Sequence, residues 1–372
     1  MENSFIPYGR QWIDEDDISE VVKSLNSDLL TQGPKVEEFE KAVAEYTGAE
    51  YGVAVSSGTA ALELAYKVIG ISDSDEIITS PLTFSATSNA FVNLGARPVF
   101  IDIEKDTLNI DPKEIENKIT KKTKAVAVID FAGHPCDFDE IKKIAKRHNL
   151  LIVEDASHAI GSSYKDKRIG SLSDLTVFSF HPVKNITTGE GGMVLTNNKE
   201  LYEKLKVLRH HKIVKIPEKG GWCYDIEEPS SNFRISDFQC ALGLSQLKKI
   251  DKFIQRRRDI AGRYNEAFKD IKNISLPREK EYAKSAWHLY IIQINSGRTK
   301  ELFESFKEQG IGVQVHYIPV HLLSFYQKRF GFREGDFPIA ENYYRKALTL
   351  PLFPKMTDYE VERVIKTVKK LL

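Results

Sequence analysis

Short apolar runs alternate with helical patterns along the first half of the chain. The runs YGVAV, EIIT, PVFI, AVAVI and LLIV are rich in β-branched residues. Each of the first four is followed by a stretch whose apolar residues recur at helical spacing. Two further runs, LTVFSF and GGMVLT, complete the series before residue 200. This alternation predicts an α/β fold with a mainly parallel, seven-stranded sheet flanked by helices.

The pattern changes after Asn232. Residues 236–268 carry apolar positions at helical spacing, which predicts one long helix leading out of the first unit. The remainder contains the strand-like runs HLYIIQI and GVQVHYIP, a helical pattern from Lys300 to Gln309 and a terminal helix TDYEVERVIKTVKKLL. We therefore expect a large domain over residues 1–250 and a small α+β domain over residues 251–372.

Composition excludes several classes of protein. The 372 residues contain 53 basic and 53 acidic side chains, so no overall field favours nucleic acid. The three cysteines show no CxxC spacing, which argues against a disulfide framework or a metal site. The sequence shows neither the basic leader typical of secreted proteins nor the long apolar stretch typical of membrane proteins. We expect a cytoplasmic protein that binds neither nucleic acid nor membrane.

The chemistry-bearing residues gather between Leu151 and Thr196. The apolar run before Asp155 delivers this carboxylate at the end of a predicted strand, where open α/β sheets bind ligands. Its neighbour Glu154 points to the opposite face of the strand, so only one of the two can serve the same site. His158 lies three residues beyond Asp155 and can share its face on a helical turn. The next run delivers Ser179 and, one turn later, Lys184.

Two earlier strand ends add candidate contacts. Ser57, Gly58 and Thr59 lie between YGVAV and a helical pattern, so hydroxyls and free amides meet at a helix N-terminus. On this segment alone, an ordinary helix cap is the better explanation of these residues. Phe84 follows the next strand and can place an aromatic ring over the site, although an isolated phenylalanine more often packs in a core.

These motifs resemble the DegT/DnrJ/StrS family of sugar aminotransferases. Family members carry an acidic-Asp-x-x-His/Gln segment and then Ser-Phe-His-x-x-Lys-x-Ile-Thr-x-x-Glu-Gly-Gly, and this chain reads EDASH and SFHPVKNITTGEGG. The resemblance extends from Tyr8 to about Pro354. It implies the aspartate-aminotransferase-like fold of type I and the cofactor pyridoxal 5'-phosphate. A dehydratase branch of the family has histidine in place of the lysine, so Lys184 favours transamination.

The resemblance also implies roles for the cofactor residues. Lys184 forms the Schiff base, Asp155 keeps the pyridine nitrogen protonated and His158 lies near the phenolic oxygen. Phe84 stacks on the cofactor ring. The phosphate is held by Ser57, Gly58, Thr59 and Ser179, and by Asn232 from the partner subunit, which implies a homodimer with shared active sites. Relatives usually carry Arg-x-His-Gly where this chain reads RHHK, so substrate contacts between Arg209 and Tyr224 do not transfer.

The substrate implied by the resemblance is a nucleotide-linked keto sugar, with L-glutamate as amino donor. Candidate substrate contacts are Tyr8, Thr31, Arg234, His316, Tyr317 and His321, although strand histidines and tyrosines often only pack. The segments LLTQGPKVEEFE and VQVHYIPVHL are most similar to the branch that acts in pseudaminic acid biosynthesis. Members of that branch aminate C4 of a UDP-linked 4-keto-2-acetamido-2,6-dideoxy-L-sugar.

Three alternatives remain open at this point. The chain could act on a different nucleotide keto sugar, with another C4 configuration or a 3-keto group. It could also be a non-catalytic regulator that binds the cofactor. A nucleotide-binding protein of another class is disfavoured, because GEGG and SSGTAA match neither GxGxxG nor GxxxxGK[ST].

Overall fold

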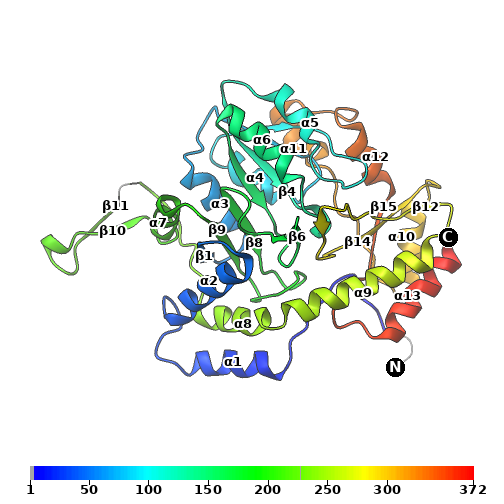
Figure 1. Cartoon of the computed structure of the whole chain (residues 1–372), viewed down its shortest axis with the longest axis horizontal. Coiled ribbons are helices and arrows are strands. Elements are labelled where there is room, and N and C mark those ends of the chain that lie inside the picture. Colours follow the sequence, from blue (N-terminus) through cyan, green and yellow to red (C-terminus); the bar gives the residue numbers. More distant parts are fainter. Residues whose placement is uncertain (1–3, 227) are drawn as a thin grey trace.

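Seven strands form a central sheet in the order β1-β9-β8-β5-β4-β2-β3 (Figure 1). The computed structural model describes residues 4–226 and 228–372. Neighbouring strands are parallel except around β9, which is antiparallel to β1 and to β8. The predicted mainly parallel seven-stranded sheet is confirmed. Its strands are β1 (Tyr51–Val55), β2 (Glu76–Thr79), β3 (Arg97–Phe100), β4 (Thr123–Ile129), β5 (Leu151–Asp155), β8 (Leu175–Ser179) and β9 (Gly192–Thr196).

Helices cover both faces of this sheet. Side chains alternate along each strand, so in β4 Val126 and Val128 enter one hydrophobic cluster while Ala125 and Ala127 enter the other. The first cluster is closed by α2 (Pro34–Thr47), α6 (Phe138–His148) and α8 (Asp237–Leu247). The second is closed by α3 (Gly58–Val68), α4 (Ala86–Val92) and α7 (Lys199–Leu208).

A smaller antiparallel sheet lies beside the large one, with strand order β12-β14-β15 (Figure 1). Its core cluster is completed by three helices. These elements are β12 (Ile274–Ser275), β14 (Tyr290–Ile294), β15 (Ala347–Leu350), α9 (Ile250–Phe268), α10 (Thr299–Glu308) and α13 (Asp358–Leu371). Helix α9 contributes to both units, since Phe253 belongs to the first cluster of the large sheet and Tyr264 to the core cluster of the small sheet. The division at residue 250 stays a prediction.

Two predicted elements differ from the structure. The long helix over 236–268 is wrong, because the chain ends α8 at Leu247 and starts α9 at Ile250. Lys249, at the break, has φ −106° and ψ −4° and pairs with Asp14 and Asp17. The run GVQVHYIP forms no strand; within it only Gln314 makes an isolated bridge, to Thr349, and β15 takes the place beside β14.

The remaining helices and small strands lie outside the two sheets described above. A hairpin of β10 and β11 projects away from the body of the molecule at the left of Figure 1. Over residues 4–226 and 228–372, no helix has the length and apolar character needed to cross a bilayer. The elements are α1 (Glu15–Leu25), α5 (Pro112–Ile115), α11 (Ser324–Phe330), α12 (Pro338–Lys346), β6 (Ser163–Tyr164), β7 (Lys167–Arg168), β10 (Ile213–Lys215), β11 (Tyr224–Ile226) and β13 (Ala283–Lys284).

Candidate active site

The carboxyl ends of β5 and β8 bring the central acid and the central amine together. Asp155 is the last residue of β5, and Lys184 lies in the loop that follows β8. These strands are direct parallel neighbours, so both residues emerge at the same edge of the sheet. Burial lowers the pKa of Lys184 to about 8, and the charge of Asp155 opposes this shift. Near neutral pH a usable fraction of this amine is therefore unprotonated.

Asp155 is held in place by two donors. The Thr87 hydroxyl donates to Asp155 Oδ2 at 2.6 Å, and the Ser157 amide donates to Oδ1 at 3.1 Å. Glu154 points to the other face of the sheet, where it accepts from the Thr176 hydroxyl at 2.7 Å. Burial raises the pKa of Glu154, and burial together with Glu154 raises that of Asp130. The two neighbouring carboxylates thus have separate environments, and only Asp155 faces Lys184.

A cradle for an anion lies at the N-terminus of α3. The Ser57 side chain caps this helix by accepting from the Ala60 amide at 3.1 Å. A Cβ atom on Gly58 would lie 2.8 Å from Cβ of Ser179, so no larger residue fits between these two segments. A Cβ on Gly192 would lie 2.4 Å from the Ser57 carbonyl oxygen. Thr59 is exposed in the same first turn. Helix amides and hydroxyls here form a site suited to a phosphate.

Aromatic side chains border the space beside Lys184. The Tyr317 hydroxyl and His158 Nε2 are 3.2 Å apart, and the Phe84 ring centroid lies 5.8 Å from that of Tyr317. Phe84 is 59 % exposed, so its ring face is available to a ligand. Burial, with a contribution from Lys184, lowers the pKa of His158 well below its usual range. His158 is therefore neutral near pH 7.

The predicted sugar contacts Tyr8 and His316 adjoin this group. Their ring centroids are 5.4 Å apart, and His316 Nδ1 lies 2.8 Å from the Thr349 hydroxyl. Burial lowers the pKa of His316 to about 3. The segment after Tyr8 reaches the Lys184 loop, because a Cβ on Gly9 would lie 3.6 Å from Cβ of Val183. Tyr8, His316 and Tyr317 thus surround the approach to Lys184.

The remaining predicted contacts lie on another segment. Asn232 is exposed, and its side chain accepts from the Arg234 amide at 3.2 Å. Arg234 contacts His210 Nδ1 and lines a pocket of about 430 Å³ between α2 and α7. Thr31 is exposed and pairs through its backbone with Ser236, the residue that caps α8. Neither Lys184 nor Asp155 lines this pocket.

A comparison with known protein families shows the family of this chain. Residues 11–369 match the model of the DegT/DnrJ/EryC1/StrS aminotransferase family. The chain belongs to this family. Its members are sugar aminotransferases, so the alternative of a non-catalytic regulator is set aside.

Two relatives match along nearly their full length. The spore coat polysaccharide biosynthesis protein SpsC of Bacillus subtilis is 46 % identical over 380 residues, covering 100 % of this chain and 98 % of that protein. The UDP-4-amino-4,6-dideoxy-N-acetyl-beta-L-altrosamine transaminase of Campylobacter jejuni is 44 % identical over 373 residues, covering 99 % and 97 %.

Solved structures of similar proteins share the fold. Helicobacter pylori PseC, described as an aminotransferase of pseudoaminic acid biosynthesis, superposes with a TM-score of 0.94 at 35 % identity, covering 99 % of both chains. The PLP form of the sugar aminotransferase Spr1654 from Streptococcus pneumoniae superposes with a TM-score of 0.93 at 34 % identity, covering 99 % and 100 %. The aspartate-aminotransferase-like fold and the cofactor pyridoxal phosphate are both confirmed.

The residues of this chain fit that cofactor. A half-buried amine with a lowered pKa lies opposite a carboxylate anchored by two hydrogen bonds, and the cradle at α3 has no room for a side chain at Gly58 or Gly192. Over the residues that the structure describes, no group of histidine, cysteine and carboxylate side chains is arranged to bind a metal ion.

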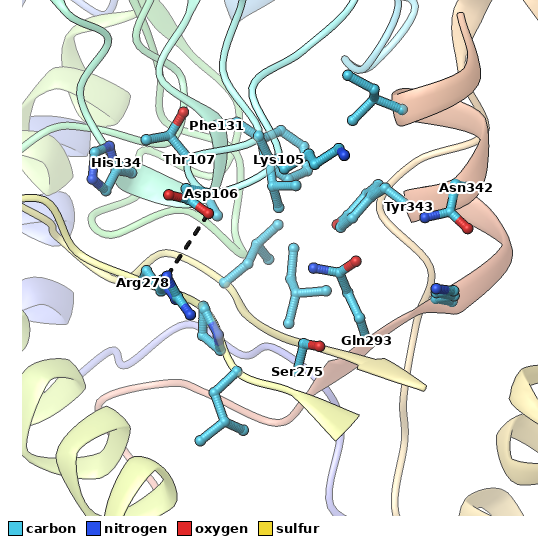
Figure 2. A pocket seen from close by; sticks show the side chains of 18 of the residues that line it. Lys105, Asp106, Thr107, Phe131, His134, Ser275, Arg278, Gln293, Asn342 and Tyr343 are labelled. Carbon is cyan, nitrogen blue, oxygen red and sulfur yellow. Dashed lines mark ion pairs between the residues drawn. The ribbon is translucent and has the colours of Figure 1, made fainter. Parts of the chain in front are cut away.

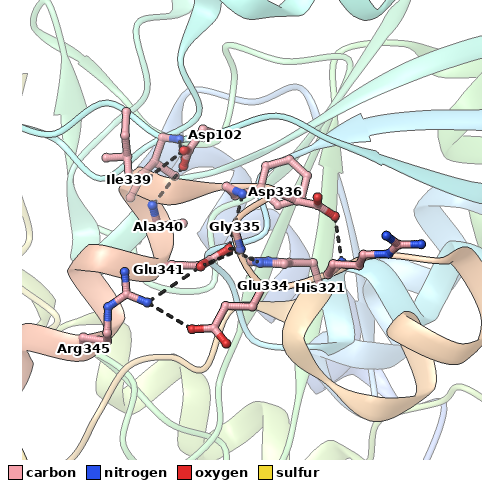
Figure 3. A network of polar contacts seen from close by, with 12 residues as sticks. Asp102, His321, Glu334, Gly335, Asp336, Ile339, Ala340, Glu341 and Arg345 are labelled. Carbon is pink, nitrogen blue, oxygen red and sulfur yellow. Dashed lines mark hydrogen bonds and ion pairs between the residues drawn. The ribbon is translucent and has the colours of Figure 1, made fainter.

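His321 is not brought to this site. It has no exposed surface and lies 3.0 Å from Glu341, which also accepts hydrogen bonds from the Gly335 and Phe337 amides (Figure 3). Asp102 accepts from the Ile339 and Ala340 amides in the same network and so anchors the start of α12. This geometry favours the packing alternative for His321 over a contact with the sugar.

Glu341→Ala is expected to lower the free energy of unfolding by about 3 kcal/mol, because it leaves His321 and two amides unpaired in the core. Burial lowers the pKa of His321, and hydrogen bonds from His321 and Gly335 outweigh burial in lowering that of Glu341. Glu341 raises the pKa of His321 against the effect of burial, so its loss makes His321 harder to protonate in the folded protein. The stability gap between wild type and Glu341→Ala should therefore widen as the pH falls below about 6.5.

Urea unfolding at pH 7.5 and pH 5 measures this effect. The matched control is Glu334→Ala, which removes an exposed partner of Arg345 in the same network and should cost less than about 0.5 kcal/mol. Equal losses in the two variants, or a smaller gap at pH 5 than at pH 7.5, would contradict this role of Glu341.

Sequence reasoning missed two residues of the site. Thr87 on α4 orients Asp155, and its side chain is fully buried. A polar residue at a buried position of a helical pattern is the feature of the sequence that could have indicated this role. His288 lies with its ring centroid 4.4 Å from that of His158. It occurs in WHLYIIQI, immediately before β14, and no local motif distinguishes it from a core residue.

Proposed function

We propose that this family member transfers the amino group of L-glutamate to C4 of a UDP-linked 4-keto-2-acetamido-2,6-dideoxy-L-sugar, as a step of pseudaminic acid biosynthesis. The observation that carries the proposal is end-to-end similarity to a transaminase named for a UDP-linked 4-amino-4,6-dideoxy-N-acetyl-beta-L-altrosamine. We further propose that the protein acts in the cytoplasm, where nucleotide sugars are available.

The cofactor is proposed to be held at both ends. Lys184 would bind its aldehyde carbon covalently, Asp155 would face the ring nitrogen, and Phe84 and His158 would border the ring and its phenolic oxygen. Ser57, Gly58, Thr59 and Ser179 would hold the phosphate at the start of α3. When bound, pyridoxal phosphate supplies a carbon that exchanges an amino group and a ring that accepts electrons.

Lys184 is proposed to move the proton in both halves of the reaction. Released from the cofactor, its neutral amine takes a proton from Cα of the amino donor. In the second half it returns a proton at the carbon that receives the amino group. The pKa of about 8 supports this role, because the amine can both accept and donate a proton near neutral pH.

Asp155 is proposed to face the ring nitrogen throughout the cycle. Its two donors, Thr87 and Ser157, orient the carboxylate toward the ring nitrogen. A fixed negative charge there favours the protonated nitrogen, which strengthens the ring as an electron acceptor.

Sugar discrimination is proposed to depend on Tyr8, His316 and Tyr317. Their polar atoms are half-buried or buried near Lys184, so a wrong hydroxyl or acetamido pattern would leave them unpaired. Thr31 and Arg234 are proposed to contact the nucleotide. The diphosphate adds affinity for every nucleotide sugar alike and therefore does not select the sugar.

We infer a homodimer in which Asn232 reaches the partner's cofactor phosphate. Large apolar side chains are exposed on α1, on the segment after it and on the β10–β11 hairpin, which is typical of a surface that another subunit covers. These side chains are Ile18, Val22, Leu25, Leu29, Leu30, Trp222 and Tyr224.

Mixing two inactive variants tests this arrangement. A dimer of one Lys184→Ala chain and one Asn232→Ala chain has one site with both defects and one with neither. Random exchange of subunits should therefore restore about a quarter of the wild-type activity per chain. Each variant mixed with itself is the control. No recovery after verified exchange, or a monomer at micromolar concentration, would show that Asn232 acts within its own chain.

A panel of substrates tests the proposed sugar. The enzyme is supplied with glutamate and with the product of a 5-inverting 4,6-dehydratase acting on UDP-N-acetylglucosamine, and we expect a 4-amino-L-sugar by mass spectrometry and NMR. The D-configured 4-keto epimer and a 3-keto sugar are run in parallel and should react at least about tenfold more slowly. Faster amination of either would overturn the substrate while leaving the aminotransferase activity intact.

A second candidate is a different nucleotide keto sugar used for a surface polysaccharide. The observation that favours it is the slightly higher identity to SpsC of Bacillus subtilis, whose name refers to spore coat polysaccharide. The same panel distinguishes the two candidates.

A further inference from the structure

A pocket of about 590 Å³ lies between the two units, apart from Lys184 and Asp155 (Figure 2). Its walls come from the segments 105–108 and 131–134 of the large unit, from β14 and the chain before it, and from α12. The volume is within the range of sites that hold small organic molecules. Phe131 forms part of the wall toward the site, since its ring centroid is 6.2 Å from that of His158.

Strand β14 turns a polar stripe toward this pocket. Its residues alternate, so Ile292 and Ile294 enter the core of the small unit, while Ile291 and Gln293 line the pocket, as does Asn295 just after the strand. Gln293 is the one residue of this strand that is not buried. The side-chain amide of Gln293 makes no hydrogen bond within residues 4–226 and 228–372, and the same holds for the side-chain amide of Asn342 on α12. Both amides are labelled in Figure 2.

Two lysines at the pocket are also unpaired. Lys105 and Lys346 line it from opposite units, and neither forms an ion pair with any residue of the described ranges. The acid of the pocket, Asp106, is already neutralised, since Lys280 lies 3.0 Å and Arg278 3.9 Å from its carboxylate. The pocket therefore carries excess positive charge.

The floor of the pocket is apolar and partly aromatic. Phe131, Trp287, Leu289 and Tyr343 are all buried there. Such a floor suits the flat apolar face of a sugar ring. An entirely apolar ligand would leave two amides and two ammonium groups without partners.

We propose that this pocket binds a phosphorylated sugar. The amides of Gln293 and Asn342 would bind ring hydroxyls, the aromatic floor would contact the ring face, and Lys105 and Lys346 would bind the phosphate. Backbone amides at the start of α12 are not available for that phosphate, because Asp102 already accepts from Ile339 and Ala340. This inference does not rest on the proposed substrate.

Calorimetric titration of the cofactor-loaded enzyme with N-acetylglucosamine 1-phosphate tests the proposal. We expect saturable binding whose Kd rises about tenfold in Gln293→Leu and in Lys346→Met, because each removes one hydrogen-bonding group or charge. The matched control is Lys366→Met, which removes an exposed lysine on α13. Transaminase activity measured without the probe should be unchanged in all three variants.

Two further ligands separate the parts of the proposal. Inorganic phosphate and N-acetylglucosamine should each bind at least about tenfold more weakly than the combined molecule. Equal affinity for phosphate alone would overturn the sugar contacts, and equal affinity for the uncharged sugar would overturn the phosphate contacts. Binding that is unaffected by Gln293→Leu and Lys346→Met would place the probe elsewhere and overturn the site, as would no binding at all.

Discussion

Lys184→Ala is expected to lower transaminase turnover by at least about a thousandfold, because it removes both the covalent attachment of the cofactor and the group that moves the proton. The side chain is half-buried and has a pKa of about 8. An exposed lysine with an ordinary pKa is almost fully protonated at neutral pH and therefore cannot replace it. Steady-state rates with glutamate and the UDP-linked keto sugar measure the loss.

Two companion variants separate chemistry from structure. Lys167→Ala removes an exposed lysine of β7 and should retain wild-type turnover. Lys184→Arg keeps a positive charge but cannot release a proton, so it should be about as inactive as the alanine variant. Substantial turnover in Lys184→Arg would show that charge alone is needed at this position.

Asp155→Asn is expected to lower turnover by about a hundredfold or more while leaving the fold intact. Asparagine keeps the size of the side chain and can still accept from Thr87, but it removes the negative charge that favours a protonated ring nitrogen. Steady-state kinetics give the loss, and the absorption spectrum of the bound cofactor gives a reading that does not depend on turnover.

Glu154→Gln is the matched control for this change. Glu154 accepts from Thr176 on the face of the sheet away from Lys184, and glutamine keeps an oxygen that can accept that hydrogen bond. Turnover of Glu154→Gln should therefore stay within about tenfold of wild type. The reverse order of effects would mean that Glu154, and not Asp155, serves the cofactor.

The sheet could be predicted because its strands are short and bounded by clear helical patterns. In β4 and β5 almost every residue is buried on one face or the other, which gives the continuous apolar runs typical of parallel strands. The break between α8 and α9 could not be predicted, because no proline or glycine marks it. Lys249 is drawn to Asp14 and Asp17, more than 200 positions earlier in the chain.

Sequence could predict candidate site residues only where these residues occur in local motifs. Asp155, Lys184 and the segment Ser57–Thr59 occur at strand ends, and the topology brings those ends to one edge of the sheet. His321 lies only four residues after Tyr317, so the sequence predicts it beside the other substrate contacts. Its actual partner, Glu341, lies on α12, and a contact between distant segments leaves no mark on local spacing.

The most direct test of the central claim is borohydride reduction of the enzyme after loading with pyridoxal phosphate in the absence of amino donor, followed by peptide mapping. Because Lys184 is proposed to bind the cofactor covalently, reduction should fix one cofactor per chain, and the modified peptide should contain Lys184. Cofactor fixed to any other lysine, or no fixed cofactor in an enzyme that is active and contains it, would contradict the account.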